Sequence, residues 1–178
     1  DVSFDVGVID MPDRQAQDVY THDFAKSGNM VLFGTSKVGK STAATNLILS
    51  LAAKNTPESL NMYIVDFGNA ALFGLKSLPQ VADYISFDDE EKFRKLRNLL
   101  SDEISDRKRK FAKTNVTTLE MYNDSAAEKL PAIIIVIDNY DLIKEIDIDL
   151  ENYFTQLTRD GLGVGIYTFA TATRANAM

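Results

Sequence analysis

The stretch MVLFGTSKVGKST, residues 30–42, sets the architecture of this 178-residue chain. Four apolar residues lead into Gly34, and residues 34–41 then fit the pattern G-x-x-x-x-G-K-S/T at every position. Glycines at these positions let backbone N–H groups curl around a phosphate, which is how a phosphate loop binds. The apolar run indicates a buried strand before the loop, and residues 42–53 have the pattern of an amphipathic helix after it. This context argues against an accidental match.

Individual residues of the loop predict a site for ATP and Mg²⁺. Lys40 is placed to reach the β- and γ-phosphate oxygens, and the hydroxyl of Ser41 is placed to hold Mg²⁺. The helix that begins here directs its positive N-terminal end at the phosphates. The nucleotide-binding residues predicted from this pattern are Gly34, Thr35, Ser36, Lys37, Val38, Gly39, Lys40, Ser41 and Thr42.

A second uninterrupted apolar run, AIIIVI at residues 132–137, ends at Asp138. Such a run is typical of a central parallel strand, and an aspartate at its end is the second magnesium-site residue of phosphate-loop enzymes, the Walker B aspartate. Ser41 and Asp138 are therefore predicted to share the metal. Asp66 lies near the end of another apolar strand, residues 60–67, where it either faces the ligand or caps the following turn.

Strands and helices alternate along the rest of the chain, which predicts the α/β class: a P-loop NTPase with a mostly parallel sheet flanked by helices. Residues 1–28 are expected to form a lead-in β-hairpin packed on the main domain, residues 29–178. Further strands are predicted at residues 2–9, 19–24, 60–67, 132–137 and 163–171, and further helices at residues 118–122 and 150–160, with a long helix opening near Ser86.

Composition limits the classes of partner. A net charge of −7 argues against the nucleic acid backbone. The basic cluster RKRK, residues 107–110, lies at helical spacing from acidic residues, so it predicts a solvated helix face with i,i+4 pairs rather than a DNA-binding patch. His22, the only histidine, has no motif around it and is expected to have a surface role. With no cysteines, disulfides and thiolate metal sites are excluded.

Five further segments span nearly the whole chain: VGVIDMPDRQAQ (6–17), YIVDFGNAALFGLKSLPQVADYI (63–85), EISDRKRKFAKTNVTTLEMYN (103–123), IIIVIDNYD (133–141) and TATRANAM (171–178). Their order and content resemble the FtsK/SpoIIIE family of P-loop ATPases, including its E-x-x-x-R-K/R-x-x-F/Y helix and its Y-N pair. Within that family the resemblance is greatest to the third, last ATPase module of the type VII protein-secretion motors of Gram-positive bacteria.

This resemblance implies a RecA-like sheet with the nucleotide at the C-terminal edge of its strands. It also implies a longer, membrane-anchored protein with tandem ATPase modules at the cytoplasmic face of the cell membrane, assembled as a ring oligomer. Small helical secreted proteins are the implied partners, received in an apolar pocket. Leu72, Phe73 and Leu75 are candidates for that pocket, although core packing is the more ordinary role for such residues. By the same comparison the chain is a C-terminally truncated fragment that stops at Met178.

The chain departs from the family pattern where hydrolysis is catalysed. The family carries a glutamate directly after the Walker B aspartate, which orients and deprotonates the attacking water. Here that catalytic position beside Asp138 is Asn139. An amide holds a water but does not accept its proton at neutral pH. Asp141, three residues beyond Asp138, is expected to point elsewhere.

Three other departures point the same way. Lys37 replaces the glycine of active relatives, and a lysine resists positive φ. Ala172 replaces the glutamine of the family's T-Q-R-P sensor. Arg159 matches an arginine that could act in trans within a ring, but the family's following G-R pair reads Gly161-Leu162 here. We therefore predict nucleotide binding with little hydrolysis. The alternative is a working ATPase, either of a secretion motor or of a DNA translocase.

Overall fold

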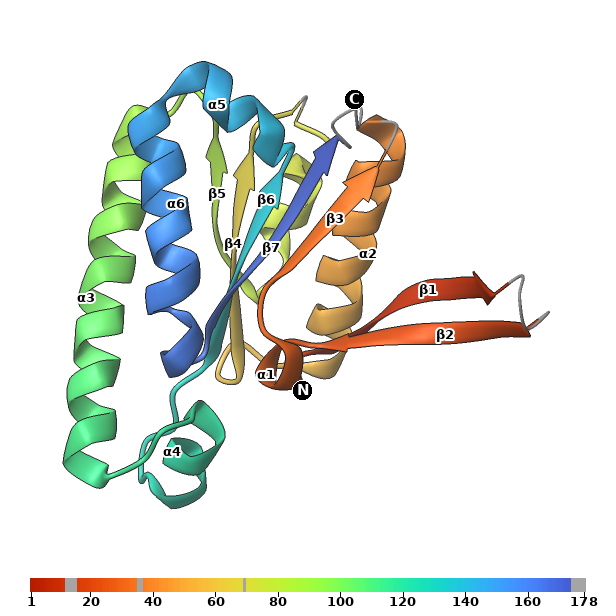
Figure 1. Ribbon diagram of the computed structural model, residues 1–178. Coiled ribbons are helices and arrows are strands. Elements are labelled where there is room, and N and C mark those ends of the chain that lie inside the picture. The colour runs from red at the N-terminus through yellow and green to blue at the C-terminus, as the bar shows by residue number, and fades with distance from the viewer. Residues whose placement is uncertain (12–15, 35–36, 69, 174–178) are drawn as a thin grey trace.

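Figure 1 shows the computed structural model, which describes residues 1–11, 16–34, 37–68 and 70–173. Within these ranges, five strands form a parallel sheet in the order β3-β7-β6-β4-β5, and two form an antiparallel hairpin. The strands are β1 (Ser3–Met11), β2 (Ala16–Asp23), β3 (Met30–Gly34), β4 (Leu60–Asp66), β5 (Val81–Ser86), β6 (Ala132–Asp138) and β7 (Ile166–Thr173).

The helices connect these strands by crossovers. They are α1 (Phe24–Ser27), α2 (Lys37–Lys54), α3 (Glu90–Thr114), α4 (Leu119–Ser125), α5 (Ile143–Ile146) and α6 (Ile148–Asp160), with 3₁₀ turns at Phe73–Ser77, Tyr140–Leu142 and Leu162–Val164. In the described part of the chain, no helix combines the length and the apolar character needed to cross a bilayer.

The predicted α/β phosphate-loop architecture is confirmed, and the strands expected near β4, β6 and β7 are present. One strand, β5, is missing from the sequence-based prediction, because its six residues run directly into the acidic segment that was assigned to the next helix. That helix, α3, begins at Glu90 rather than at Ser86. Asp89 caps it, and its side chain accepts a hydrogen bond from the backbone N–H of Lys92 at 3.0 Å.

The sheet lies between two layers of helices (Figure 1). On one face, α2 packs Leu47 and Ile48 against Phe169 of β7. On the other face, α3 and α6 bury Phe93 and Phe154 in a cluster with the central strands. Because both faces are covered, every residue of β6 is buried, which explains its unbroken apolar sequence. Polar side chains are therefore concentrated where the strands end.

The hairpin is anchored to the domain at its base. Phe4 and Phe24 are buried there, and the Phe4 ring makes an edge-on contact with Phe169, with centroids 6.3 Å apart. Beyond this base, β1 and β2 extend away from the sheet (Figure 1). The prediction of a surface role for His22 is wrong: the ring is buried against Phe24, and its Nε2 donates to the carbonyl of Gly28 at 2.8 Å.

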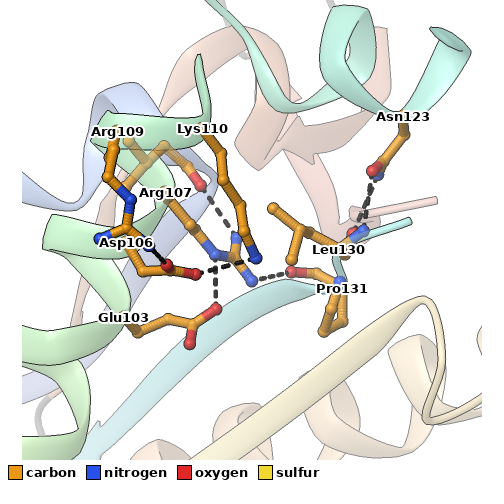
Figure 2. Close-up of polar contacts among 9 residues, drawn as sticks. Glu103, Asp106, Arg107, Arg109, Lys110, Asn123, Leu130 and Pro131 are labelled. Carbon is orange, nitrogen blue, oxygen red and sulfur yellow. Dashed lines mark hydrogen bonds and ion pairs between the residues drawn. The ribbon is translucent and has the colours of Figure 1, made fainter. Parts of the chain in front are cut away.

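Arg107 is the second residue whose predicted environment is wrong. Its side chain is fully buried, whereas the RKRK cluster was expected to face solvent throughout. Its Nε donates to Glu103 at 2.9 Å, and its other nitrogens donate to the carbonyls of Val164 and Pro131 (Figure 2). Arg107 therefore ties α3 to the chain entering β6 and to the turn before β7.

Two other basic residues of the cluster, Arg109 and Lys110, behave as predicted. Arg109 and Lys110 both pair with Asp106 at i,i+3 and i,i+4 on the outer side of α3 (Figure 2). The hydrogen bond from Lys110 lowers the pKa of the partly exposed Asp106 carboxyl. Nearby, Asn123 of the Y-N pair bonds both the N–H and the carbonyl of Leu130, each at 2.9 Å. The two family motifs thus fix the segment leading into β6.

Replacing the buried arginine is expected to destabilise the fold. Arg107→Met keeps most of the apolar stem but leaves two buried carbonyls and Glu103 without their donors, so we expect a loss of about 2–4 kcal/mol in the free energy of unfolding. Arg109→Met, at a side chain that is 73% exposed, should change stability by less than about 0.5 kcal/mol. Urea denaturation measures both; equal losses would contradict a structural role for Arg107.

Candidate functional site

The C-terminal ends of the parallel strands meet at one edge of the sheet, beside the start of α2 (Figure 1). Polar side chains from three elements lie there: Lys40 and Ser41 from the first turns of α2, Asp138 from the end of β6, and Thr171 and Thr173 from the end of β7. In open parallel sheets this edge is where ligands bind, because strand ends and helix N-termini converge on it.

Asp138 is the centre of the polar contacts at this edge. Its carboxylate is completely buried. The hydroxyl of Ser41 donates to Oδ2 at 3.0 Å, and the hydroxyl of Thr171 donates to Oδ1 at 2.7 Å. The two residues predicted to share Mg²⁺, Ser41 and Asp138, are therefore in direct contact, although 97 positions separate them in sequence.

Lys40 lies beside this pair. Its side chain is only 2% exposed, and its Nζ donates to the hydroxyl of Thr173 at 2.7 Å. The same ammonium group lies 3.9 Å from Oδ1 of Asp141. Asp141 in turn accepts the backbone N–H of Thr173 at 3.2 Å. The expectation that Asp141 points elsewhere is wrong: the 3₁₀ turn after β6 carries its carboxylate across to the end of β7.

Asn139, at the position of the missing glutamate, is buried in an unusual backbone conformation. Its φ of 63° and ψ of 51° lie in the left-handed region, which asparagine adopts more readily than most residues. Its N–H donates to the Thr171 hydroxyl at 3.0 Å. A Cβ added at Gly68 would come within 2.3 Å of the Asn139 Nδ2, so a larger residue there would have to displace the amide.

Asp66 caps a turn, which decides between the two roles open to it. Its Oδ1 accepts the N–H of Gly68 at 2.8 Å, and its Oδ2 accepts the Tyr84 hydroxyl at 2.7 Å. Burial raises the pKa of that hydroxyl, and the bond to Asp66 raises it further. Asp66 is the register partner of Asp138 on the neighbouring strand, so it supports the site from beside it.

The other predicted residues are placed as follows. Gly34 ends β3, and Gly39 and Thr42 lie in the first turns of α2, next to Lys40 and Ser41. Thr35 and Ser36 lie outside the described residues, as do the side chains of Lys37 and Val38. Arg159 is exposed near the C-terminal end of α6, at the opposite edge of the sheet (Figure 1), so it does not join the site of its own chain.

These residues fit a magnesium ion held together with nucleotide phosphates. Mg²⁺ prefers oxygen ligands and is usually held by one or two protein groups plus phosphate oxygens and water. The hydroxyl of Ser41 and the carboxylate of Asp138 are such groups. A cage made of three or more His, Cys, Asp or Glu side chains is absent from the described ranges. Ser41 and Asp138 would hold such an ion, which would supply positive charge to offset that of the nucleotide phosphates.

The strand before the phosphate loop, β3, lies at the edge of the sheet and is only partly buried, so the expectation of a buried strand there is wrong. Together, β3, the helix α2 that carries Lys40 and Ser41, and Asp138 at the end of β6 define a P-loop ATPase domain. Residues 2–175 match the profile of the FtsK/SpoIIIE family, and the chain belongs to that family. The resemblance inferred from the motifs is thus confirmed.

Two similar proteins from type VII secretion systems indicate which members of the family the chain resembles. The chain is 40% identical over 176 residues to the ESX secretion system protein EccC of Geobacillus thermodenitrificans (strain NG80-2), covering 99% of this chain and 12% of that protein. It superposes on the structure of EssC (ATPases 2 and 3) from the same species with a TM-score of 0.91 and 40% identity, covering 100% of this chain and 34% of that one. The chain is therefore homologous to ATPase domains of type VII secretion proteins.

A third relative has been solved with a peptide. The structure described as Thermomonospora curvata EccC (ATPases 2 and 3) in complex with a signal sequence peptide matches with a TM-score of 0.84 and 28% identity, over 97% of this chain and 32% of that one.

The Thr171 hydroxyl is expected to stabilise the site more than an exposed hydroxyl would. Thr171→Val removes one donor from buried Asp138 and the acceptor of the Asn139 N–H, so we expect a loss of about 1–3 kcal/mol in unfolding free energy. Thr21→Val is the matched control, since the Thr21 hydroxyl bonds Asp5 at the same 2.7 Å but at the surface. It should cost less than about 0.5 kcal/mol by thermal or urea denaturation; similar losses would argue against the buried network.

Proposed function

We propose that this chain is a nucleotide-binding module of a type VII protein-secretion ATPase, which binds ATP with Mg²⁺ and hydrolyses it little. The contact between Ser41 and Asp138 carries the binding half of the proposal. It puts a hydroxyl and a carboxylate together beside Lys40, which is the arrangement that a nucleotide–magnesium complex requires.

Asn139 supports the other half. Its amide lacks the basicity of the family's glutamate, and the residue is folded against Gly68 in a left-handed conformation. A residue that aligns water for attack on a phosphate must face the phosphate and accept a proton. The amide of Asn139 cannot serve as that base.

The proposed biological role is regulation or substrate reception within a longer protein. We expect other ATPase domains of the same chain, in a ring oligomer at the cytoplasmic face of the cell membrane, and small helical secreted proteins as partners. Relatives described as ATPases 2 and 3, one of them with a signal sequence peptide, support this expectation. Of the three apolar candidates, Leu72 is buried in the core, Leu75 is partly buried, and Phe73 is exposed with its edge on Tyr84.

A second function, a working ATPase, has one observation in its favour. The carboxylate of Asp141 lies near Lys40, so an acid is present at the edge of the site even though Asn139 is not one. The acidic net charge and the secretion relatives favour a secretion motor over a DNA translocase under this alternative.

Lys40 provides the test of binding. Titration of a fluorescent ATP analogue with Mg²⁺ should give saturable binding to the 178-residue chain, and Lys40→Ala should weaken it at least about tenfold, since the ammonium contacts the β- and γ-phosphates. Binding that is insensitive to this substitution would contradict the phosphate-loop site. Steady turnover at about 1 s⁻¹ or more would contradict the claim of little hydrolysis.

Restoring a glutamate at position 139 is not expected to restore ATP hydrolysis. Asn139→Glu places a longer side chain against Gly68 and near Asp66, at a left-handed position that glutamate tolerates less well by about 1 kcal/mol. Asn115→Glu is the matched control, because Asn115 is also left-handed, with φ 60°, but lies exposed after α3. We expect Asn139→Glu to destabilise the chain more than Asn115→Glu and to leave turnover below about 1 s⁻¹. Motor-like turnover would show that the backbone adapts.

A further inference from the structure

The ammonium group of Lys40 is already engaged by protein groups from two other elements. It donates to Thr173 of β7 at 2.7 Å and lies 3.9 Å from Asp141 of the 3₁₀ turn that follows β6. A nearly buried lysine needs such partners, because an unpaired buried charge is costly. The partners here do not belong to the phosphate-loop pattern, which describes only the loop and helix.

Thr173 holds both members of the pair in place. Its hydroxyl accepts from Lys40, while its backbone N–H donates to the Asp141 carboxylate at 3.2 Å. Lys40, Asp141 and Thr173 therefore form a closed ring of contacts at the C-terminal end of β7. The Asp141 side chain remains 38% exposed, so the ring is accessible from solvent on its acidic side.

We propose that Asp141 is an internal counter-ion for Lys40 that competes with nucleotide phosphates and sets the affinity of this site. The inference rests on the proposed function, since it concerns the same lysine. A phosphoryl oxygen that approaches Lys40 must share the ammonium group with a carboxylate of the same sign as itself. Like charges at such separations repel, and the repulsion rises with the number of phosphate charges.

This assignment makes a distinction among nucleotides. ATP and ADP place β- or γ-phosphates at Lys40, whereas AMP has neither. Asp141 therefore penalises ATP most, ADP less, and AMP little. A counter-ion role differs from a role of the Asp141 carboxylate in hydrolysis. The latter would leave the affinity for nucleotide unchanged and affect the rate of turnover.

The experiment neutralises Asp141 without removing its shape. Asp141→Asn keeps an oxygen that accepts the Thr173 N–H, so the fold is expected to survive, which circular dichroism and thermal denaturation check. We expect affinity for Mg–ATP to rise about threefold to tenfold, with a smaller rise for ADP and no change for AMP. Asp141→Glu, which retains the charge, should stay within about twofold of the parent chain.

Matched controls separate this inference from general charge effects and from the proposed function. Asp149→Asn removes the same charge at an exposed position on α6 and should leave all three affinities unchanged. Unchanged or weaker Mg–ATP binding by Asp141→Asn, while Lys40→Ala still weakens binding at least about tenfold, would overturn the counter-ion assignment alone. Loss of turnover by Asp141→Asn at unchanged affinity would also overturn the counter-ion assignment and would favour a role of the Asp141 carboxylate in hydrolysis. Lys40→Ala without effect would overturn the proposed function itself.

Discussion

The completely buried carboxylate of Asp138 is the constraint on which the site depends. A buried charge without hydrogen-bond donors costs several kcal/mol, so the fold must deliver donors to it. It does so from two directions, with Ser41 from the helix after the phosphate loop and Thr171 from the adjacent strand. The Asp138 side chain thereby links the end of β6 both to the adjacent strand β7 and to the start of α2.

The same logic applies at the opposite edge of the sheet. There the buried cation of Arg107 binds the carbonyls of Pro131 and Val164, which lie where β6 and β7 are about to begin. Between these two edges, residues 132–137 of β6 are all apolar. The pair of central strands is thus anchored by a buried anion at its C-terminal end and a buried cation at its N-terminal end. Only the first of these lies at the edge where open parallel sheets generally bind ligands.

The sequence predicted what local patterns and spacing determine, and missed what distant contacts determine. Residues 34–41 and Asp138 follow patterns whose chemistry is local, and their convergence follows from parallel strand topology. The contact of Asp141 with Lys40 depends on the path of a short 3₁₀ turn. The burial of His22 and Arg107 depends on carbonyls far along the chain or beyond a turn, at Gly28 and Val164. A polar residue on its own gives no sign of such partners, so its ordinary exposed environment is the default expectation.

The replacement at Asn139 is more than a change of one functional group. Its left-handed backbone suits asparagine, its N–H shares the Thr171 hydroxyl with Asp138, and its amide lies where a Cβ at position 68 would meet it. Gly68 is in turn held by Asp66, which is bound to Tyr84. Because Thr171 and Gly68 both lie against Asn139, the longer side chain of a glutamate introduced there would crowd Gly68. The packing at the C-terminal end of β6 is therefore matched to the amide of Asn139.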